Sequence, residues 1–353
     1  HPYLARRVQD QDFFVSYSTG AHTVVGDAQL IIDAAEGERV QVARESLADH
    51  DIERRYGWSA FCRTNPGGAL DTLRGAPLDS ANAPLWLDLI STLSYPEREV
   101  DSDRGALVVA LFAAVEPAKA PFLAQVVDRL TDLYRHSPRR TEPAIAAWWP
   151  RLFEAAVARD TEPLDTTSDL SADWINAAGG RLTEELLIDI DASRTAGDVI
   201  NRELLQALDT AVAAPGRQGA MARAALVVNA SFVLTIEGQT VVPALVASLE
   251  GDGSEAIALR ELLVTTSRWS LVASRTFGVA ILRGVRELTG RGPALTNAAA
   301  KIILPALSFL RGERTEVDWG MGVNDAASAL RDGPLELRRG VAQLMEHLIT
   351  QKD

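Results

Sequence analysis

The sequence contains a single cysteine, Cys62, and five histidines among 353 residues. One cysteine excludes an intrachain disulfide, and five scattered histidines beside it offer no set of zinc ligands at a recognisable spacing. We therefore expect no metal and no cofactor. For Cys62, which lies in "WSAFCRT", we favour a buried structural thiol over a nucleophile that needs a distant histidine as its base, and we nominate no catalytic residue.

Basic residues are in deficit. The chain has 35 Lys and Arg against 48 Asp and Glu, which gives a formal charge of −13 at pH 7. Because this charge repels phosphate, nucleic acid is the less expected partner, although a local basic patch is compatible with it.

Long hydrophobic runs are missing as well. The longest strongly apolar run, "GALVVALFAAV" at 105–115, is shorter than the about 20 residues that a membrane-spanning helix needs. We expect a core helix there and no membrane partner. The chain begins with His1 and shows no secretory signal pattern, so we expect a fragment, a processed chain or one domain of something larger. The single cysteine makes the cytoplasm the expected compartment.

Amphipathic helices account for most of what is present. Apolar residues recur at steps of three and four, as expected for one face of a helix. The three clearest stripes are Phe122, Val126, Leu130 and Leu133, then Phe277, Ile281, Val285 and Leu288, and finally Leu337, Val341, Leu344 and Leu348. The opening segment differs, because Phe13, Val15 and Tyr17 alternate as in a short strand or extended arm.

These patterns predict an all-α fold of about fourteen helices joined by short connections. Short connections favour antiparallel neighbours, and no fixed tetratricopeptide or ankyrin period is present. We therefore expect an array of antiparallel helix pairs, a HEAT-like α-solenoid. The expected parts are an extended N-terminal segment or linker at 1–37, an N-terminal helical set at 38–160 and a C-terminal helical set at 161–353, divided near the polar stretch 160–172.

The segment "DWINAAGGRLTEELL" at 173–187 places two glycines before a helical pattern. A phosphate-binding loop would follow a buried strand and would carry Gly-Lys-Ser or Gly-x-Gly-x-x-Gly, and neither is present. We interpret the glycines as a helix-to-helix corner. Asp165, Asp169 and Asp173 lack the spacing of a calcium loop, so we expect them to cap helices in a solvated loop.

Two features suggest contacts with a protein partner. Trp148 and Trp149 are adjacent, and consecutive residues of a helix point about 100° apart, so both are buried only if their helix is packed on two sides. Otherwise one of them faces a partner. Arg139 and Arg140 belong to the basic run "RHSPRR" at 135–140, which is either a solvated turn or a docking patch.

The stretch "NAAGGRLTEELL" resembles the motif Asn-His-Pro-Ala-Gly-Arg-Leu-Thr-Glu-x-Leu-Leu of the helical region that follows sirtuin-like domains in bacterial antiphage defence proteins. The matching residues are Asn176, Gly180, Arg181, Leu182, Thr183, Glu184, Leu186 and Leu187. Ala177 and Ala178 replace the His-Pro pair. The segment 216–248 is similar to the next helix pair of that family, and the likeness covers about 140–310.

In that family the residues that cleave NAD lie in the upstream domain, and none of these 353 residues matches them. The resemblance therefore implies a non-catalytic helical module. Such a module would bind a protein partner, either a phage component or its own effector domain, or would control assembly, including assembly with copies of itself.

Two alternatives stay open. One is an all-α enzyme whose site is assembled from distant residues such as Glu184, Arg181 and a histidine. The other is a HEAT-like nucleic-acid clamp, which requires several arginines to converge on one face. These arginines would be Arg135, Arg139, Arg140, Arg217 and Arg223.

Overall fold

The computed structural model describes residues 26–95, 104–164, 170–266, 269–288, 297–304 and 319–350. Within these ranges the chain has 20 α-helices, a further helical segment at 297–304 and no strand, which confirms the all-α prediction. The helices outnumber the about fourteen expected from periodicity. The reason is that α2, α4, α10 and α16 span only four or five residues each, too few to show a period.

The expected extended N-terminal segment lies mostly outside the described residues, including Phe13, Val15 and Tyr17. Its described part, 26–37, contains the short helix α2 (Gln29–Asp33), in which Ile31 is buried. An extended conformation is therefore wrong for these residues, because Ile31 is packed as part of a helix.

The chain divides into two compact units, residues 1–159 and 160–353. The division falls at the beginning of the polar stretch 160–172. Asp165 and Asp169, expected as helix caps, lie outside the described residues.

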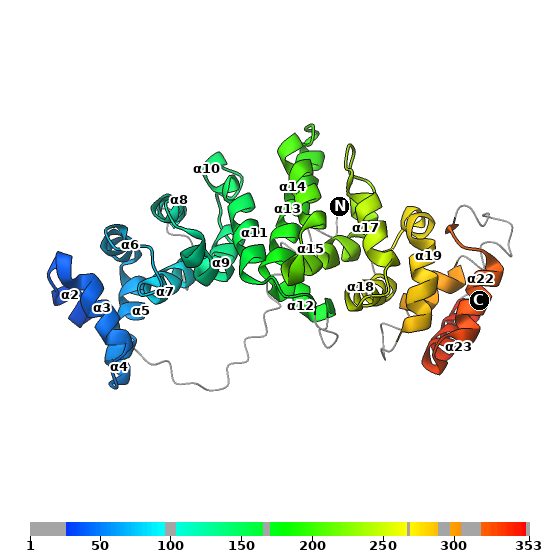
Figure 1. Ribbon diagram of the computed structural model, residues 1–353, viewed down its shortest axis with the longest axis horizontal. Coiled ribbons are helices and arrows are strands. Elements are labelled where there is room, and N and C mark those ends of the chain that lie inside the picture. Colours follow the sequence, from blue (N-terminus) through cyan, green and yellow to red (C-terminus); the bar gives the residue numbers. More distant parts are fainter. Residues whose placement is uncertain are drawn as a thin grey trace. The chain divides into compact units, whose positions relative to one another are not determined.

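Unit 1 is a succession of helices in which neighbours pack on one another (Figure 1). In chain order they are α2 (Gln29–Asp33), the 3-10 helix η2 (Glu36–Glu38), α3 (Arg39–Leu47), α4 (Ile52–Arg55), α5 (Gly57–Thr64), α6 (Pro66–Arg74), α7 (Ala83–Ser94), α8 (Arg104–Val115), α9 (Ala120–Arg135), α10 (Pro143–Ala146) and α11 (Trp148–Arg159). Helix α5 packs on α7, α7 on α9 and α9 on α11, while α6 packs on α8 and α8 on α10.

The core of unit 1 follows the apolar stripes. The four stripe residues of α9 are all buried, and the run at 105–115 forms the core helix α8 as predicted. Trp86 of α7 meets Phe122 edge-on with ring centroids 6.3 Å apart, which joins the stripe of α9 to the neighbouring helix.

Unit 2 has the same kind of sequential packing. Its helices are α12 (Leu170–Asn176), α13 (Ala178–Ala196), α14 (Arg202–Ala213), α15 (Gly216–Val228), α16 (Ala230–Val233), α17 (Val241–Glu250), α18 (Ser254–Thr265), α19 (Leu271–Glu287), α22 (Val323–Asp332) and α23 (Leu335–Thr350), with a further helical segment at 297–304. Helix α13 packs on α15, α15 on α18, α18 on α19 and α19 on α22; α14 packs on α17.

The predicted stripe on α19 is buried from Phe277 to Leu288. On α23 the prediction holds for Leu337, which is fully buried, whereas Val341 and Leu344 are half-buried and the side chain of Leu348 lies outside the described ones. In the part of the chain that the structure describes, no helix combines the length and the apolar character needed to cross a membrane.

Candidate functional site

The segment 176–187, which carries the motif described above, contains the beginning of α13, and neighbouring helices pack closely against it. The chain turns at Ala177, between α12 and α13, and Gly179 and Gly180 lie in the first turn of α13. A Cβ at Gly180 would overlap the carbonyl of Trp174, and one at Gly179 would overlap the carbonyl of Gln218. The glycines are therefore required because α12 and α15 approach the backbone of α13 closely.

The other motif residues also serve packing. Leu182, Leu186 and Leu187 are buried, and Thr183 donates a hydrogen bond to the Gly179 carbonyl at 2.8 Å. These residues form an interior surface, as expected of a stretch that positions helices.

The polar members of the motif do not gather into one open site. Asn176 is exposed and donates to the Ala172 carbonyl at 3.0 Å. Glu184 is only 2% exposed, and Arg181 is half-buried. The enzyme alternative places Glu184 and Arg181 at its site. In the structure the side chain of Glu184 is enclosed by the protein and does not face solvent.

A polar cluster holds the beginning of α15. Arg217 pairs with Asp173 at 3.2 Å and with Asp160 at 4.0 Å. Gln218 donates to Asp160 at 3.2 Å and accepts from the backbone N–H of Gly179 at 2.8 Å. These bonds tie α12, α13 and the segment at 160 to α15, and they show that Asp173 pairs with an arginine of another helix.

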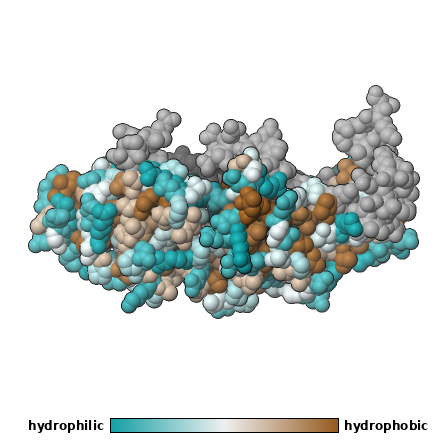
Figure 2. All heavy atoms as spheres, turned by 90° about the horizontal axis from the view of Figure 1, so that it is seen from above, coloured by the Kyte–Doolittle hydropathy of each residue, from teal (hydrophilic) through white to brown (hydrophobic). Residues whose placement is uncertain are grey.

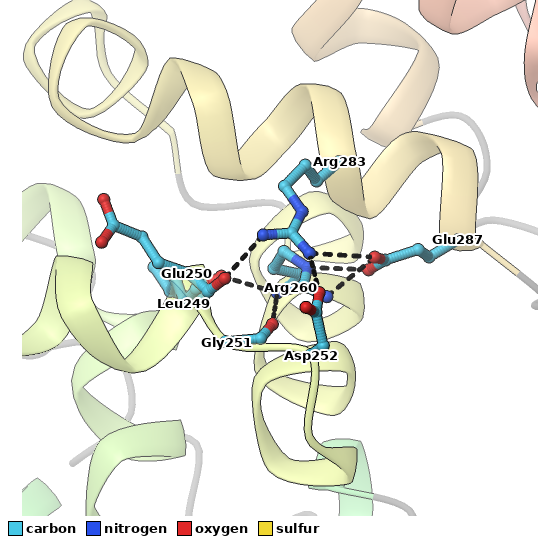
Figure 3. Close-up of polar contacts among 7 residues, drawn as sticks. All are labelled: Leu249, Glu250, Gly251, Asp252, Arg260, Arg283 and Glu287. Carbon is cyan, nitrogen blue, oxygen red and sulfur yellow. Dashed lines mark hydrogen bonds and ion pairs between the residues drawn. The ribbon is translucent and has the colours of Figure 1, made fainter.

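Among the charged side chains that the structure describes in unit 2, that of Arg260 of α18 is the most enclosed, since it is fully buried. Its Nη1 donates to the carbonyls of Leu249 and Gly251, at 2.7 and 2.6 Å, where α17 ends. Its Nε and Nη2 donate to the Glu287 carboxylate of α19, at 2.7 and 2.8 Å. Figure 3 shows the guanidinium between the end of α17 and Glu287.

Arg283 of α19 reaches the same loop beside Arg260, as Figure 3 also shows. It donates to the Glu250 carbonyl at 2.6 Å and to Asp252 at 2.5 Å. Asp252 is 94% exposed. The contact between Arg283 and Asp252 therefore lies at the surface, whereas the guanidinium of Arg260 is enclosed by the protein.

Arg223 of α15 repeats the arrangement one helix pair earlier. It donates to the carbonyls of Val212 and Ala214, at 3.0 and 2.7 Å, where α14 ends. It also pairs with Glu255 of α18 at 2.5 Å. Both arginines follow their two carbonyls by eleven and nine residues. An arginine thus joins the end of one helix to a carboxylate of a later helix at two places, and it is fully buried at Arg260 and 11% exposed at Arg223.

These contacts bear on the nucleic-acid alternative. Arg217 and Arg223 are engaged by carboxylates and carbonyls of their own unit. They hold helices together, and their donors are directed at protein acceptors.

Trp148 and Trp149 of α11 are each only 5% exposed. Trp148 packs against Phe112 with ring centroids 5.1 Å apart, and the Arg151 guanidinium lies 4.4 Å from its ring centre. Trp149 stacks on Phe153 at 4.9 Å. The partner-binding interpretation is therefore wrong for both tryptophans, because α11 is packed on two sides.

The basic run ends α9 and leads into α10. Arg139 is exposed and pairs with Glu142 at 3.5 Å, and Arg140 is half-buried. The His136 Nδ1 lies 2.8 Å from the Asp132 carbonyl, and because a carbonyl only accepts, this nitrogen carries the hydrogen. Burial lowers the pKa of His136, so the ring is neutral at physiological pH.

Cys62 is fully buried between α5 and its neighbours. Burial raises the pKa of its thiol, and the charge of Asp88 on α7 acts in the same direction. Burial likewise raises the pKa of the Asp88 carboxyl to about 6, against the opposing effect of Arg63. A thiol in this environment stays protonated and is a poor nucleophile.

Lys301 is 3% exposed and caps the end of α18. Its Nζ donates to the carbonyls of Val264, at 2.9 Å, and Thr266, and it lies 5.1 Å from the ring centre of Trp269. Burial lowers the pKa of Lys301 from 10.5 to about 7. Among the described residues, no group of three His, Cys, Asp or Glu side chains is placed to hold a metal ion.

Sequence reasoning did not single out Arg260, Glu287 or Lys301. The available signal was a charged residue inside an apolar helical run, as in "AIALRELLV" for Arg260. Such a residue is seldom buried without partners. A second signal was the spacing of nine and eleven residues between the end of α17 and Arg260.

Comparison with known proteins gives one long match and two negative results. No family model matches the chain, and no solved structure matches it. The chain is 27% identical over 352 residues to a protein of Sinorhizobium fredii (strain NBRC 101917 / NGR234) described as uncharacterized protein y4cA. The match covers 99% of this chain and 29% of that relative, so the chain is similar to one segment of a much longer protein.

Proposed function

We propose that this chain is a helical scaffold that binds a protein partner within a larger defence protein. The observation that carries the proposal is the sequential packing of unit 2, in which α13, α15, α18, α19 and α22 each pack on the next. Helix pairs stacked in this way form HEAT-like arrays, whose repeats present extended surfaces to proteins and need no catalytic residue.

The polar interior supports the same proposal. The side chains of Arg223 and Arg260 bind carbonyls and carboxylates that join one helix pair to the next. The family-like residues from Leu182 to Leu187 are buried. Charged groups of this kind hold a framework in place, which leaves binding to the outer helix faces.

The partner follows from the likeness of 176–187 to the helical region beside sirtuin-like domains. In this proposal the whole chain senses a phage component or controls the assembly of an attached NAD-cleaving effector. The 29% coverage of the long relative supports a segment that acts beside other domains.

A pull-down from phage-infected and uninfected bacteria tests the proposal, with this chain as bait and mass spectrometry of the retained proteins. We expect a phage protein, or the effector domain of the same system, to be retained and then to bind the purified chain in calorimetry. A Gly180→Leu bait, in which the beginning of α13 is disrupted, is the control for folding.

The purified chain is also mixed with NAD, and nicotinamide release is measured. We expect none. Steady release of nicotinamide by the chain alone would overturn the proposal in favour of an enzyme, and so would the absence of any protein that binds the folded bait but not the control.

A further inference from the structure

The outer side of α19 combines exposed apolar residues with exposed arginines. Val272 and Val279 are 55% and 68% exposed, and Arg275 and Arg286 are exposed as well. Val272, Val279 and Arg286 follow one another at intervals of seven, and Arg275 stands three after Val272. Residues at this spacing form one line along a helix.

The opposite sides of α19 are fixed by close backbone contacts. A Cβ at Gly278 would overlap the carbonyl of Gly320, and one at Gly284 would lie 2.9 Å from the carbonyl of Arg260. These two glycines therefore turn toward neighbouring segments of unit 2, and the line through Val272 and Val279 is the one that faces outward.

The charged residues on this line are both arginines, in a chain of net charge −13. The only acidic residue of α19 is Glu287, whose carboxylate is bound by Arg260. Within the part of the chain that the structure describes, neither Arg275 nor Arg286 forms a side-chain hydrogen bond or an ion pair. By contrast, the exposed residues of α14 include both signs, for example Arg202, Glu203 and Asp209.

We infer that the outer face of α19 is a docking surface for an acidic amphipathic helix of a partner protein. A helix laid along α19 would place apolar side chains against Val272 and Val279, and Asp or Glu side chains opposite Arg275 and Arg286. The inference rests on the proposed scaffold function and adds the surface and the chemistry of the partner.

A phosphate backbone fits this face less well. Two valines lie in line with the two exposed arginines, and apolar side chains gain nothing against phosphate, whereas they bury area against a helix. Figure 2 shows how hydrophobic and hydrophilic residues alternate in patches on one side of the molecule. The line on α19 differs from such general alternation because its charges all have one sign.

The test uses a fluorescent synthetic peptide of about five helical turns that has leucines on one side flanked by glutamates. Binding to the full chain is followed by fluorescence anisotropy at low and high salt. The variants are Arg275→Glu combined with Arg286→Glu, and Val279→Asp alone. Arg202→Glu, an exposed reversal on α14, is the matched control, and circular dichroism verifies that each variant is folded.

We expect the peptide to bind the wild type and Arg202→Glu equally, and to bind both α19 variants at least about tenfold more weakly. Added salt weakens the charged part of the binding. A peptide with lysines in place of the glutamates should not bind.

Failure of the acidic peptide to bind, or equal binding to all folded variants, would overturn the inference. Tight binding of a single-stranded DNA oligomer that depends on Arg275 and Arg286 would also overturn it, in favour of nucleic acid. If a partner from the pull-down binds the α19 variants as well as the wild type, the scaffold function stands and this surface is the wrong one.

Discussion

Arg260 of α18 donates two parallel hydrogen bonds to the carboxylate of Glu287 of α19, at 2.7 and 2.8 Å. Because the guanidinium is fully buried and also serves two carbonyls at the end of α17, its removal leaves several acceptors without a donor. We expect Arg260→Met to lower the free energy of unfolding by about 3 kcal/mol or more, measured by urea denaturation.

Arg283→Met provides the control for that experiment. Arg283 bonds the same loop, but its side chain is 32% exposed and its partner Asp252 is 94% exposed. Water replaces such contacts, so the expected loss is within about 1 kcal/mol. Equal losses for the two variants would show that burial does not make the Arg260 contact special.

The beginning of α13 should not tolerate a side chain at Gly180, because a Cβ there overlaps the Trp174 carbonyl. We expect Gly180→Ala to destabilise unit 2 by about 1–3 kcal/mol, since the backbone has to shift. Gly253→Ala is the comparison, because nothing lies within 4 Å of a Cβ at that position. Thermal unfolding followed by circular dichroism measures both, and a harmless Gly180→Ala would mean that the two helices are less closely packed.

Lys301 should make stability rise with pH. Its pKa is about 7 in the folded chain and 10.5 in the unfolded chain, so between these values the unfolded state binds more protons. Raising the pH in this window therefore favours folding, by on the order of 1 kcal/mol or more. Below pH 7 Lys301 is protonated in both the folded and the unfolded chain. It then no longer contributes to the change of the free energy of unfolding with pH.

Melting temperatures at pH 7 and pH 9.5 measure this effect. Lys301→Met should lose the pH-dependent gain, although it also removes the donor to two carbonyls. Lys119→Met, at an exposed position, should keep the wild-type dependence. If Lys301→Met keeps the wild-type difference in melting temperature between the two pH values, another titrating group is responsible for that difference.

Cys62 should report on the folding of unit 1. Because the thiol is buried and its pKa is raised, we expect no reaction with a disulfide reagent in the native chain at pH 8 and one reacting thiol per chain in urea. Ala81→Cys places a second thiol at an exposed position and should react without urea. Rapid labelling of native Cys62 would contradict its enclosure between helices.

The long helices could be predicted because their apolar residues repeat over several turns. The stripe from Phe122 to Leu133 is buried along its whole length. The four-residue helices α4, α10 and α16 could not be predicted, because one turn contains no repeat and their conformation depends on what packs beside them.

The sites were harder to predict than the helices. At Trp148 and Trp149 the sequence allowed either burial or a partner surface, and only packing around α11 decides between them. The sequence predicts a corner at the two glycines 179 and 180, and the structure gives the reason for them, which is the close approach of Trp174 and Gln218. The contact with Gln218 joins residues far apart in the chain, and the contact with Trp174 depends on how α12 and α13 meet, so the sequence pattern contains neither of them.

The offset shared by Arg223 and Arg260 leaves a trace in the amino-acid sequence. Each arginine stands eleven and nine residues after the two carbonyls that it binds. A duplication of one ancestral helix pair would produce this numerical rule. Insertions between the helix end and the arginine would break it, whereas insertions elsewhere would leave it intact. We expect a homologue that keeps an arginine at this spacing to keep the same contact with the end of the preceding helix.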